Sequence, residues 1–134
     1  MIIGLDLSLR AAAACAIPDD WDHDMSKVRT CVSGYPLSKG ALPAESLKRI
    51  VFITDAIVDF CRVHSATKIY VEEYAFAQGA SHSREIAELG GTLKYRLFTK
   101  LSIVAEPVVA SRARKLLLHR AQNHFGRDEM QILG

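Results

Sequence analysis

Short apolar segments alternate with polar ones over the first third of the chain. Residues 2–7 and 11–17 are rich in aliphatic side chains and are separated by a short turn at residues 8–10. Residues 18–24 contain a proline and four aspartates, a composition typical of a loop. A third apolar segment follows at residues 30–37. This pattern predicts three strands in an antiparallel meander.

After Gly40 and Pro43 the apolar positions recur every three or four residues. The spacing predicts an amphipathic helix, with its stripe at Leu47, Ile50, Val51, Thr54, Val58 and Cys61. A fourth strand is expected at residues 68–72, and residues 78–83 are expected to form a loop that leads into a second helix. The stripe of that helix consists of Ile86, Leu89, Gly90, Leu93, Leu97 and Leu101.

The pattern continues with a short fifth strand at residues 102–104, ended by Pro107, and a last helix. Ser111 can cap this helix, which runs to about Phe125 before Gly126. The order of elements predicts an α/β fold with a mixed sheet, in which three antiparallel meander strands and two parallel strands are flanked by helices.

Chain length and charge narrow the picture further. The 134 residues, 49% of them hydrophobic, are enough for one core, so we expect one domain over residues 1–126 and a short tail at 127–134. The net charge is only +2, but eight basic and ten acidic residues precede Arg84, whereas nine basic and five acidic residues lie from Arg84 onward. The second part is the expected contact for a polyanion, although solvated helix faces produce the same excess.

The cysteines and the apolar runs indicate the compartment. Cys15, Cys31 and Cys61 are widely spaced and form no CxxC pair, which favours free thiols in a reducing compartment over zinc binding or a disulfide framework. No stretch approaches the roughly 20 apolar residues that cross a bilayer, and the first residues do not have the pattern of a signal peptide. We expect a soluble, cytoplasmic protein.

Two predicted strands end in carboxylates. Asp6 closes the first aliphatic strand, and Glu72 and Glu73 close the fourth. A buried carboxylate is costly and is usually paired or bound to a metal, and divalent magnesium prefers oxygen ligands. Strand alternation places Glu72 and Glu73 on opposite faces, so both cannot easily reach one ion. The pattern predicts a divalent-metal site on the sheet, with a strand-end cap or an ion pair as the alternative role for Asp6.

These motifs, Gly4-Leu5-Asp6-Leu7-Ser8, Val71-Glu72-Glu73-Tyr74-Ala75-Phe76 and Glu88-Leu89-Gly90-Gly91, give the chain a resemblance to a known family. Over roughly residues 2–118 it resembles the RuvC group of the ribonuclease H-like superfamily, particularly its short bacteriophage-type members. The resemblance implies a homodimeric endonuclease, dependent on Mg²⁺ or Mn²⁺, that resolves four-way (Holliday) DNA junctions in recombination and repair. It also implies that Asp6 and Glu72 are the catalytic metal ligands, in a bacterial or phage-infected cell.

The chain departs from this family near its end. RuvC-like nucleases carry two further acids, or an acid and a histidine, on a final helix in a pattern like D-x-x-D, and no such pattern occurs here. The departure predicts that this acidic helix is missing, by truncation or frameshift, so that cleavage is weak or absent while branched-DNA binding is retained. Asp128, Glu129 and His124 are alternative donors, although Gly126 interrupts their helix.

Several residues are candidates for DNA contact. The resemblance implies that an aromatic residue after Glu72 enters the junction, and Phe76 fits better than Tyr74; a core aromatic is the alternative. Further candidates are polar or basic side chains near the first strand and on the last two helices, namely Ser8, Arg10, Arg84, Arg112, Arg114 and Lys115.

The second helix has another face at helical spacing, formed by Ala87, Gly91, Tyr95 and Phe98. Small residues allow a second helix to approach closely, and aromatics add buried area. This face predicts a homodimer interface, or alternatively a helix packed between two core layers.

Three other functions remain open. The first is a catalytically inactive branched-DNA-binding protein, which the missing acids favour. The second is a YqgF-like nuclease with the same fold. The third is an ATP-binding fragment of the actin and sugar-kinase type, which the bulky Leu7-Ser8-Leu9 turn disfavours because backbone amides should cradle phosphate there.

Overall fold

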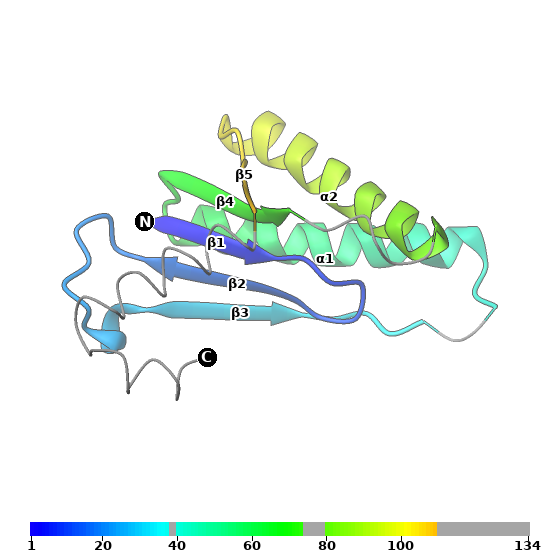
Figure 1. Cartoon of the computed structure of the whole chain (residues 1–134), viewed down its shortest axis with the longest axis horizontal. Helices are drawn as coiled ribbons and strands as arrows, with labels where there is room; N and C mark the ends of the chain where they lie inside the picture. Colours follow the sequence, from blue (N-terminus) through cyan, green and yellow to red (C-terminus); the bar gives the residue numbers. More distant parts are fainter. Residues whose placement is uncertain (38–39, 74–79, 110–134) are drawn as a thin grey trace.

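One sheet organises the molecule, and its strands are not ordered in space as they are in sequence. The computed structural model describes residues 1–37, 40–73 and 80–109. The five-stranded sheet has the order β3-β2-β1-β4-β5 (Figure 1). Its strands are β1 (Ile2–Asp6), β2 (Ala12–Ile17), β3 (Arg29–Ser33), β4 (Lys68–Glu73) and β5 (Glu106–Val109).

The sheet contains both kinds of pairing. β2 is antiparallel to β1 and to β3, whereas β4 is parallel to β1 and to β5. The predicted mixed sheet, with three meander strands and two parallel strands, is confirmed. As a result, β1, β3, β4 and β5 run in the same direction, and their C-terminal ends lie at one end of the sheet.

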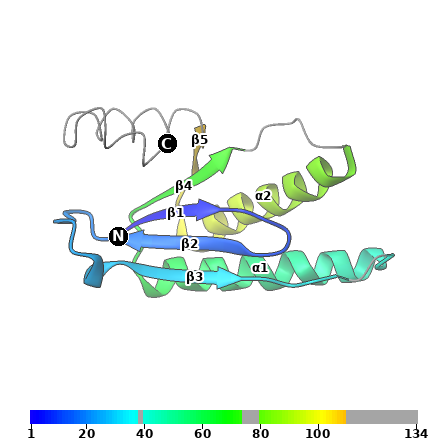
Figure 2. The same ribbon diagram turned by 60° about the horizontal axis from the view of Figure 1, so that its bottom comes forward.

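Two long helices, α1 (Pro43–Val63) and α2 (Ala80–Leu101), cover one face of this sheet (Figures 1 and 2). Proline is tolerated in the first turn of α1 because the N–H that it lacks would have no partner there. Within two residues of its end, each helix is followed by a serine in the left-handed conformation, Ser65 with φ of 51° and Ser102 with φ of 57°. A short 3₁₀ turn, Met25–Lys27, precedes β3.

The core lies between the helices and the sheet. Because side chains alternate along a strand, every second residue of the inner strands faces α1 and α2. The residues buried there include Ile3, Leu5, Leu7, Ala12, Ala14, Ala16, Ile69 and Val71 from the sheet, and Ile53, Ile57, Cys61, Leu89, Leu93 and Leu97 from the helices. The alternate positions point to the other face of the sheet, which no described helix covers.

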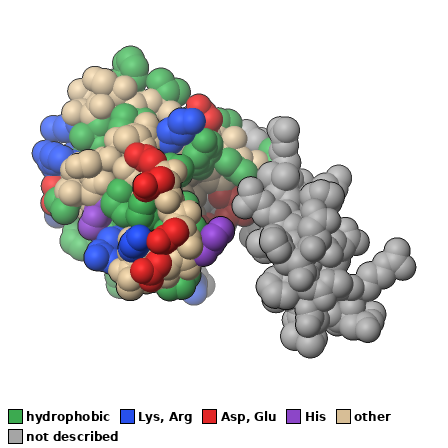
Figure 3. All heavy atoms as spheres, turned by 90° about the vertical axis from the view of Figure 1, so that its left-hand side faces the viewer, with side chains coloured by type: hydrophobic (Ala, Val, Ile, Leu, Met, Phe, Trp, Pro, Cys, Tyr) green, Lys and Arg blue, Asp and Glu red, His purple; other side chains and the backbone are tan. Residues whose placement is uncertain are grey.

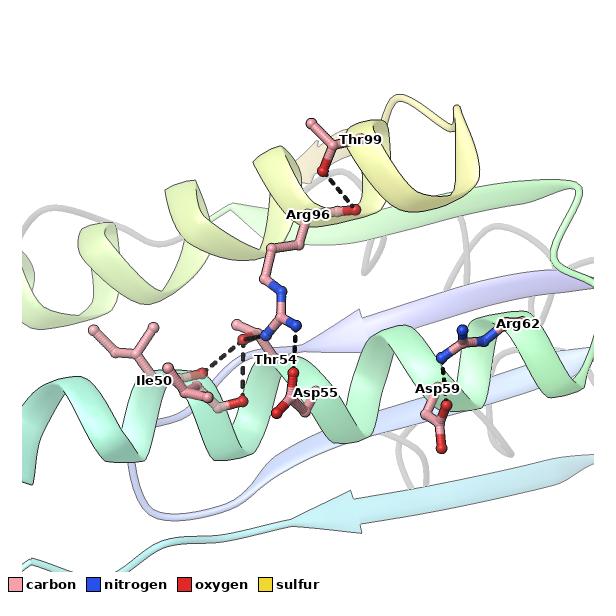
Figure 4. Close-up of polar contacts among 8 residues, drawn as sticks. Ile50, Thr54, Asp55, Asp59, Arg62, Arg96 and Thr99 are labelled. Carbon is pink, nitrogen blue, oxygen red and sulfur yellow. Dashed lines mark hydrogen bonds and ion pairs between the residues drawn. The ribbon is translucent and has the colours of Figure 1, made fainter.

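A polar link joins the two helices beside this core (Figure 4). Arg96 of α2 donates a hydrogen bond of 2.7 Å to the hydroxyl oxygen of Thr54 on α1 and forms an ion pair with Asp55. The Thr54 hydroxyl donates in turn to the carbonyl oxygen of Ile50 at 2.8 Å. Nearer the start of both helices, the largely buried Arg49 pairs with Glu85 at 3.1 Å.

Three predicted boundaries are wrong. The fifth strand is Glu106–Val109 and not residues 102–104, because Ser102 closes α2 and the chain needs the next residues to return to the sheet. β3 ends at Ser33 and not at residue 37. The next residue, Gly34, lies against the turn between β1 and β2. Residues 80–83, expected to be a loop, are the first turn of α2.

The predicted stripe of α1 was partly wrong. Leu47 and Val51 are 62% and 52% exposed, whereas Ile50, Val58 and Cys61 are buried as expected. The predicted last helix and the tail lie outside the described residues. Neither α1 nor α2 has the length and apolar character of a membrane-spanning helix, and only described residues bear on this finding.

Candidate functional site

The two strand-end carboxylates lie side by side on the uncovered face of the sheet. The parallel ladder pairs Gly4 with Tyr70 and Leu5 with Val71. The next residues are Asp6 on β1 and Glu72 on β4, so their Cα atoms are about 5 Å apart across the ladder. Leu5 and Val71 face the core, and the alternation therefore directs Asp6 and Glu72 to the opposite face.

Water reaches both carboxylates. Asp6 is exposed and Glu72 is half-buried. Neither has a hydrogen bond or an ion pair with another described residue, which argues against the alternative role of Asp6 as a member of a structural ion pair within this part of the chain. Their negative charges are adjacent and uncompensated there, which is the electrostatic arrangement that attracts a divalent cation.

A shallow hollow of about 720 Å³ begins at these carboxylates and extends along the uncovered face. Gly4, which has no side chain, forms its floor with open space above it. Tyr70 and Cys15 flank Gly4 on the adjacent strands, because the ladders pair Gly4 with both of them. The site therefore combines two oxygen donors at one end with a largely apolar surface behind them.

The carboxylate pair fits a hard cation but does not complete a site. Carboxylate oxygens are preferred ligands of Mg²⁺, which usually keeps several water molecules. Among the side chains that the structure describes, those of residues 1–37, 40–72 and 84–109, no group of three or more His, Cys, Asp or Glu is placed to hold an ion. The described side chains thus supply the two carboxylates of Asp6 and Glu72 as protein ligands.

The turn between β1 and β2 starts directly after Asp6 and carries two of the predicted DNA contacts. Ser8 is half-buried and Arg10 is exposed. The Arg10 backbone N–H donates to the Ser8 hydroxyl oxygen at 3.3 Å, which holds the turn in a compact form. Both residues therefore lie at the end of the sheet where β1 and β4 terminate and where the carboxylates lie.

Arg84 is exposed in the first turns of α2, which begins in the helical layer, on the side of the molecule toward which β1 and β4 run (Figure 1). The other predicted DNA contacts, Phe76, Arg112, Arg114 and Lys115, lie outside the described residues, as do Tyr74 and the alternative donors His124, Asp128 and Glu129. Of the predicted DNA contacts, the structure thus describes Ser8, Arg10 and Arg84, and Ser8 and Arg10 lie in the turn directly after Asp6.

The opposite end of the molecule has a mixed character. Figure 3 faces that end, and acidic and basic side chains lie next to one another there. The ion pair of Asp22 with Lys27, 2.8 Å long, is one such neighbourhood. Among the coloured side chains of this view, no large surface of one charge sign is visible.

The predicted interface residues of α2 point away from the core. Ala87 and Gly91 are exposed, and Tyr95 and Phe98 are 68% and 58% exposed. In the described structure this helix is therefore not packed between two core layers. Two exposed aromatics beside two small residues form an outward surface that a second chain could cover.

Sequence reasoning missed two residues of the uncovered face. Tyr70 was seen only as part of a strand, although its spacing of two from Glu72 already placed it on the same face. Glu106 is paired with Tyr70 across β4 and β5 and is exposed. It was missed because the fifth strand was placed too early in the chain.

A second hollow, of about 470 Å³, lies along the outer side of α1 and α2. Its charged lining is largely engaged in ion pairs, Arg96 with Asp55 and Arg62 with Asp59 (Figure 4). It lies on the helical layer, and Asp6 and Glu72 do not line it. The face with the carboxylates is therefore the better candidate site.

Comparison with known proteins identifies the fold. No protein-family model and no curated protein matches the amino-acid sequence. The structure of Thermus thermophilus RuvC in complex with a Holliday junction substrate aligns with a TM-score of 0.65 over 85% of this chain and 67% of that chain, at 11% identity. A second structure of Thermus thermophilus RuvC aligns with a TM-score of 0.55 over 94% of this chain and 69% of that chain, at 12% identity.

The fold is that of RuvC. The resemblance inferred from Asp6, Glu72 and their flanking residues is thus confirmed at the level of the fold, as is the predicted ribonuclease H-like arrangement of the mixed sheet. Membership of the short bacteriophage-type RuvC group stays a prediction. At a sequence identity of 11–12%, these alignments show a shared fold and nothing about activity. Activity is therefore argued from the site itself.

Proposed function

We propose that the chain is a metal-dependent endonuclease acting on branched DNA, with four-way junctions as its substrates. The observation that carries the proposal is the register of β1 and β4, which brings Asp6 and Glu72 together on the uncovered face of a RuvC-like sheet. The junction in one of the aligned RuvC structures is the reason for choosing four-way DNA over other nucleic acids.

The side chains fit this chemistry by type and position. Bound Mg²⁺ or Mn²⁺ supplies an activated water and stabilises the charge that develops on the leaving oxygen. Asp6 and Glu72 would hold that positive charge at the ends of two rigid strands, which is a more precise support than a loop. Arg10 and Ser8, in the turn next to Asp6, would bind the neighbouring phosphates.

DNA would approach the end of the sheet where β1 and β4 terminate. Arg84 adds positive charge at the start of α2, and the excess of basic residues from Arg84 onward acts in the same direction. Phe76, Arg112, Arg114 and Lys115 remain proposed contacts from the sequence alone.

We also propose that the active form is a homodimer through the outward face of α2. A four-way junction presents symmetric strands, so a two-fold assembly can place two sites on it at equivalent positions. Tyr95 and Phe98 are the proposed anchors, because exposed aromatics contribute most when an interface covers them.

One observation favours a second candidate, a branched-DNA-binding protein without cleavage. Two-metal nucleases normally need more than two carboxylates, and the described part of the chain groups only Asp6 and Glu72. Both candidates require the same fold and the same DNA surface, and they differ only in metal-dependent chemistry.

A labelled four-way junction separates the candidates. Purified protein is incubated with the junction in the presence of EDTA, Mg²⁺ or Mn²⁺, and binding and strand cleavage are measured in parallel. Paired nicks at symmetric positions, present only with a metal, support the nuclease. Binding in EDTA without nicks under any metal supports the inactive form, and absence of binding contradicts both.

A further inference from the structure

Gly34, the first residue after β3, lies against the turn that follows Asp6. A Cβ atom added to Gly34 would be 2.4 Å from the carbonyl oxygen of Arg10 and 3.7 Å from the Cα atom of Ala11. Cβ atoms in proteins essentially never approach a heavy atom of another residue, apart from their chain neighbours, within 3.0 Å. Any side chain at position 34 must therefore move the backbone of the turn, of β3, or of both, by at least about 0.6 Å.

The need for glycine here is steric and not conformational. Among the described glycines only Gly40 has a positive φ, 83°. Gly34 has a backbone conformation that other residues can adopt, so contact with Arg10 is the reason that a side chain is excluded. The neighbouring atom is a backbone carbonyl, which cannot rotate away as a flexible side chain would.

The turn cannot easily retreat from such a side chain. Leu7 and Leu9 are buried, and they anchor the turn in the core on both sides of Ser8. Between them, Ser8 accepts the hydrogen bond from the Arg10 N–H. With its inner side fixed by two leucines, the outer position of the turn is determined by how closely residue 34 approaches it.

We propose that Gly34 is a positioning residue of the candidate site: its missing side chain lets the exit of β3 touch the Arg10 carbonyl, and this contact sets where Ser8 and Arg10 stand beside Asp6. The inference rests on the proposed function for the roles of Ser8 and Arg10 in phosphate binding. It assigns Gly34 no contact with DNA or metal.

The first measurement does not depend on function. In ¹⁵N-labelled protein without DNA, Gly34→Ala is expected to shift the amide signals of the turn from Leu7 to Ala11. Gly90→Ala is the matched control: it adds the same methyl group 3.8 Å from a Leu7 methyl, an ordinary contact distance. Turn signals that respond no more to Gly34→Ala than to Gly90→Ala overturn the proposal.

The second measurement is a double-mutant cycle on junction cleavage, or on junction binding if the chain binds without cutting. Gly34→Ala is expected to lower the measured rate or affinity about 10- to 100-fold, because misplacement by a fraction of an ångström is costly at a reacting centre. In the Arg10→Ala background the same change should cost less than about threefold, since the group that it positions is gone. Equal losses in both backgrounds overturn the proposal.

Loss of stability is controlled separately. Ile57→Val removes one buried methylene far from the turn and should lower the melting temperature without lowering junction affinity below the transition. If Gly34→Ala does not fold, Leu9→Val loosens the inner anchor of the same turn, and it should reproduce the loss and its dependence on Arg10. If Leu9→Val lowers junction binding or cleavage no more than Ile57→Val does, the proposal is contradicted.

The proposed function and the role of Gly34 can fail separately. If the native chain does not bind junctions, the proposed function fails, while the amide signals still decide whether Gly34 sets the position of the turn.

Discussion

Asp6 and Glu72 occupy equivalent positions on adjacent parallel strands, one residue beyond the pair Leu5 and Val71. The core-facing pair fixes the register because a slip by one residue would turn two aliphatic side chains to water and two carboxylates into the core. The position of the candidate metal ligands is therefore stabilised by the hydrophobic effect on the other face of the sheet.

Asp6→Asn is expected to lower metal-dependent nicking of a four-way junction at least about 100-fold, because one charged ligand is lost. Junction binding should remain or improve, since a negative charge next to the phosphates is removed. Gel-shift and nicking assays on the same preparation measure both. The control is Asp20→Asn, which changes an exposed acid in the loop between β2 and β3. It should change neither nicking nor junction binding. Wild-type nicking by Asp6→Asn would show that the metal assignment is wrong.

Arg96→Ala is expected to lower the free energy of unfolding by about 1.5–2 kcal/mol, because it removes a charged, partly buried donor from Thr54 and from Asp55. Arg62→Ala breaks a solvent-exposed ion pair on α1 and should cost less than about 0.5 kcal/mol. Urea denaturation of both variants tests the difference. Equal losses would mean that the link between α1 and α2 is no stronger than a surface pair.

Ser65→Gly should raise the free energy of unfolding by about 0.5–1 kcal/mol, because a left-handed conformation is unfavourable for serine and not for glycine. The helix-closing bond from the Ala66 N–H to the Cys61 carbonyl oxygen, 3.0 Å long, does not involve the side chain and should persist. Ser46→Gly makes the same substitution inside α1 and should destabilise instead. Thermal melts that fail to separate the two variants contradict the assignment.

Burial raises the pKa of the Cys61 thiol from 9.0 to about 12. The unfolded chain then loses this proton before the folded chain does, so the contribution to stability is complete below pH 9 and is lost as the pH rises from there toward 12. Cys61→Ala should flatten this alkaline decline even though it lowers stability at neutral pH, and urea denaturation between pH 8 and 11 measures the slope. In the native protein, thiol reagents should modify the exposed Cys15 well before Cys61.

Tyr95→Ala combined with Phe98→Ala is expected to weaken self-association at least about tenfold if the outward face of α2 is the dimer interface. Analytical ultracentrifugation over a micromolar range gives the dissociation constant. As a control, Val63→Ala truncates a side chain of α1 that is as exposed as Tyr95, and it should leave the dissociation constant unchanged. A native chain that is monomeric throughout this range contradicts the proposed interface.

Local pattern was enough to predict the elements that hold the carboxylates. Aliphatic residues on either side of Asp6 and before Glu72 mark two strands. Apolar residues at three- and four-residue spacing mark the helices, without reference to the rest of the chain. The shared site of the two acids was expected from their places at strand ends and from the resemblance to RuvC, and the strand register now places them on adjacent strands.

Other features depend on contacts that no local pattern encodes. Residues 102–104 resemble a strand in composition, but the position of β5 is set by its pairing with β4, which begins only at Glu106. Periodicity placed Leu47 and Val51 on the apolar stripe of α1, but it could not show where that helix meets a neighbour. The glycine at position 34 is explained only by a turn 24 residues earlier in the chain.

The proline of β5 also bears on how the protein behaves at high concentration. Pro107 lies opposite Val71 on the outermost described strand, where it offers no N–H to a further strand. Edge-to-edge aggregation through β5 is therefore hindered by a single residue. The other edge, β3, has no proline between Arg29 and Ser33 and carries an exposed valine at position 32. Any growth of the sheet between molecules is expected to start from that side.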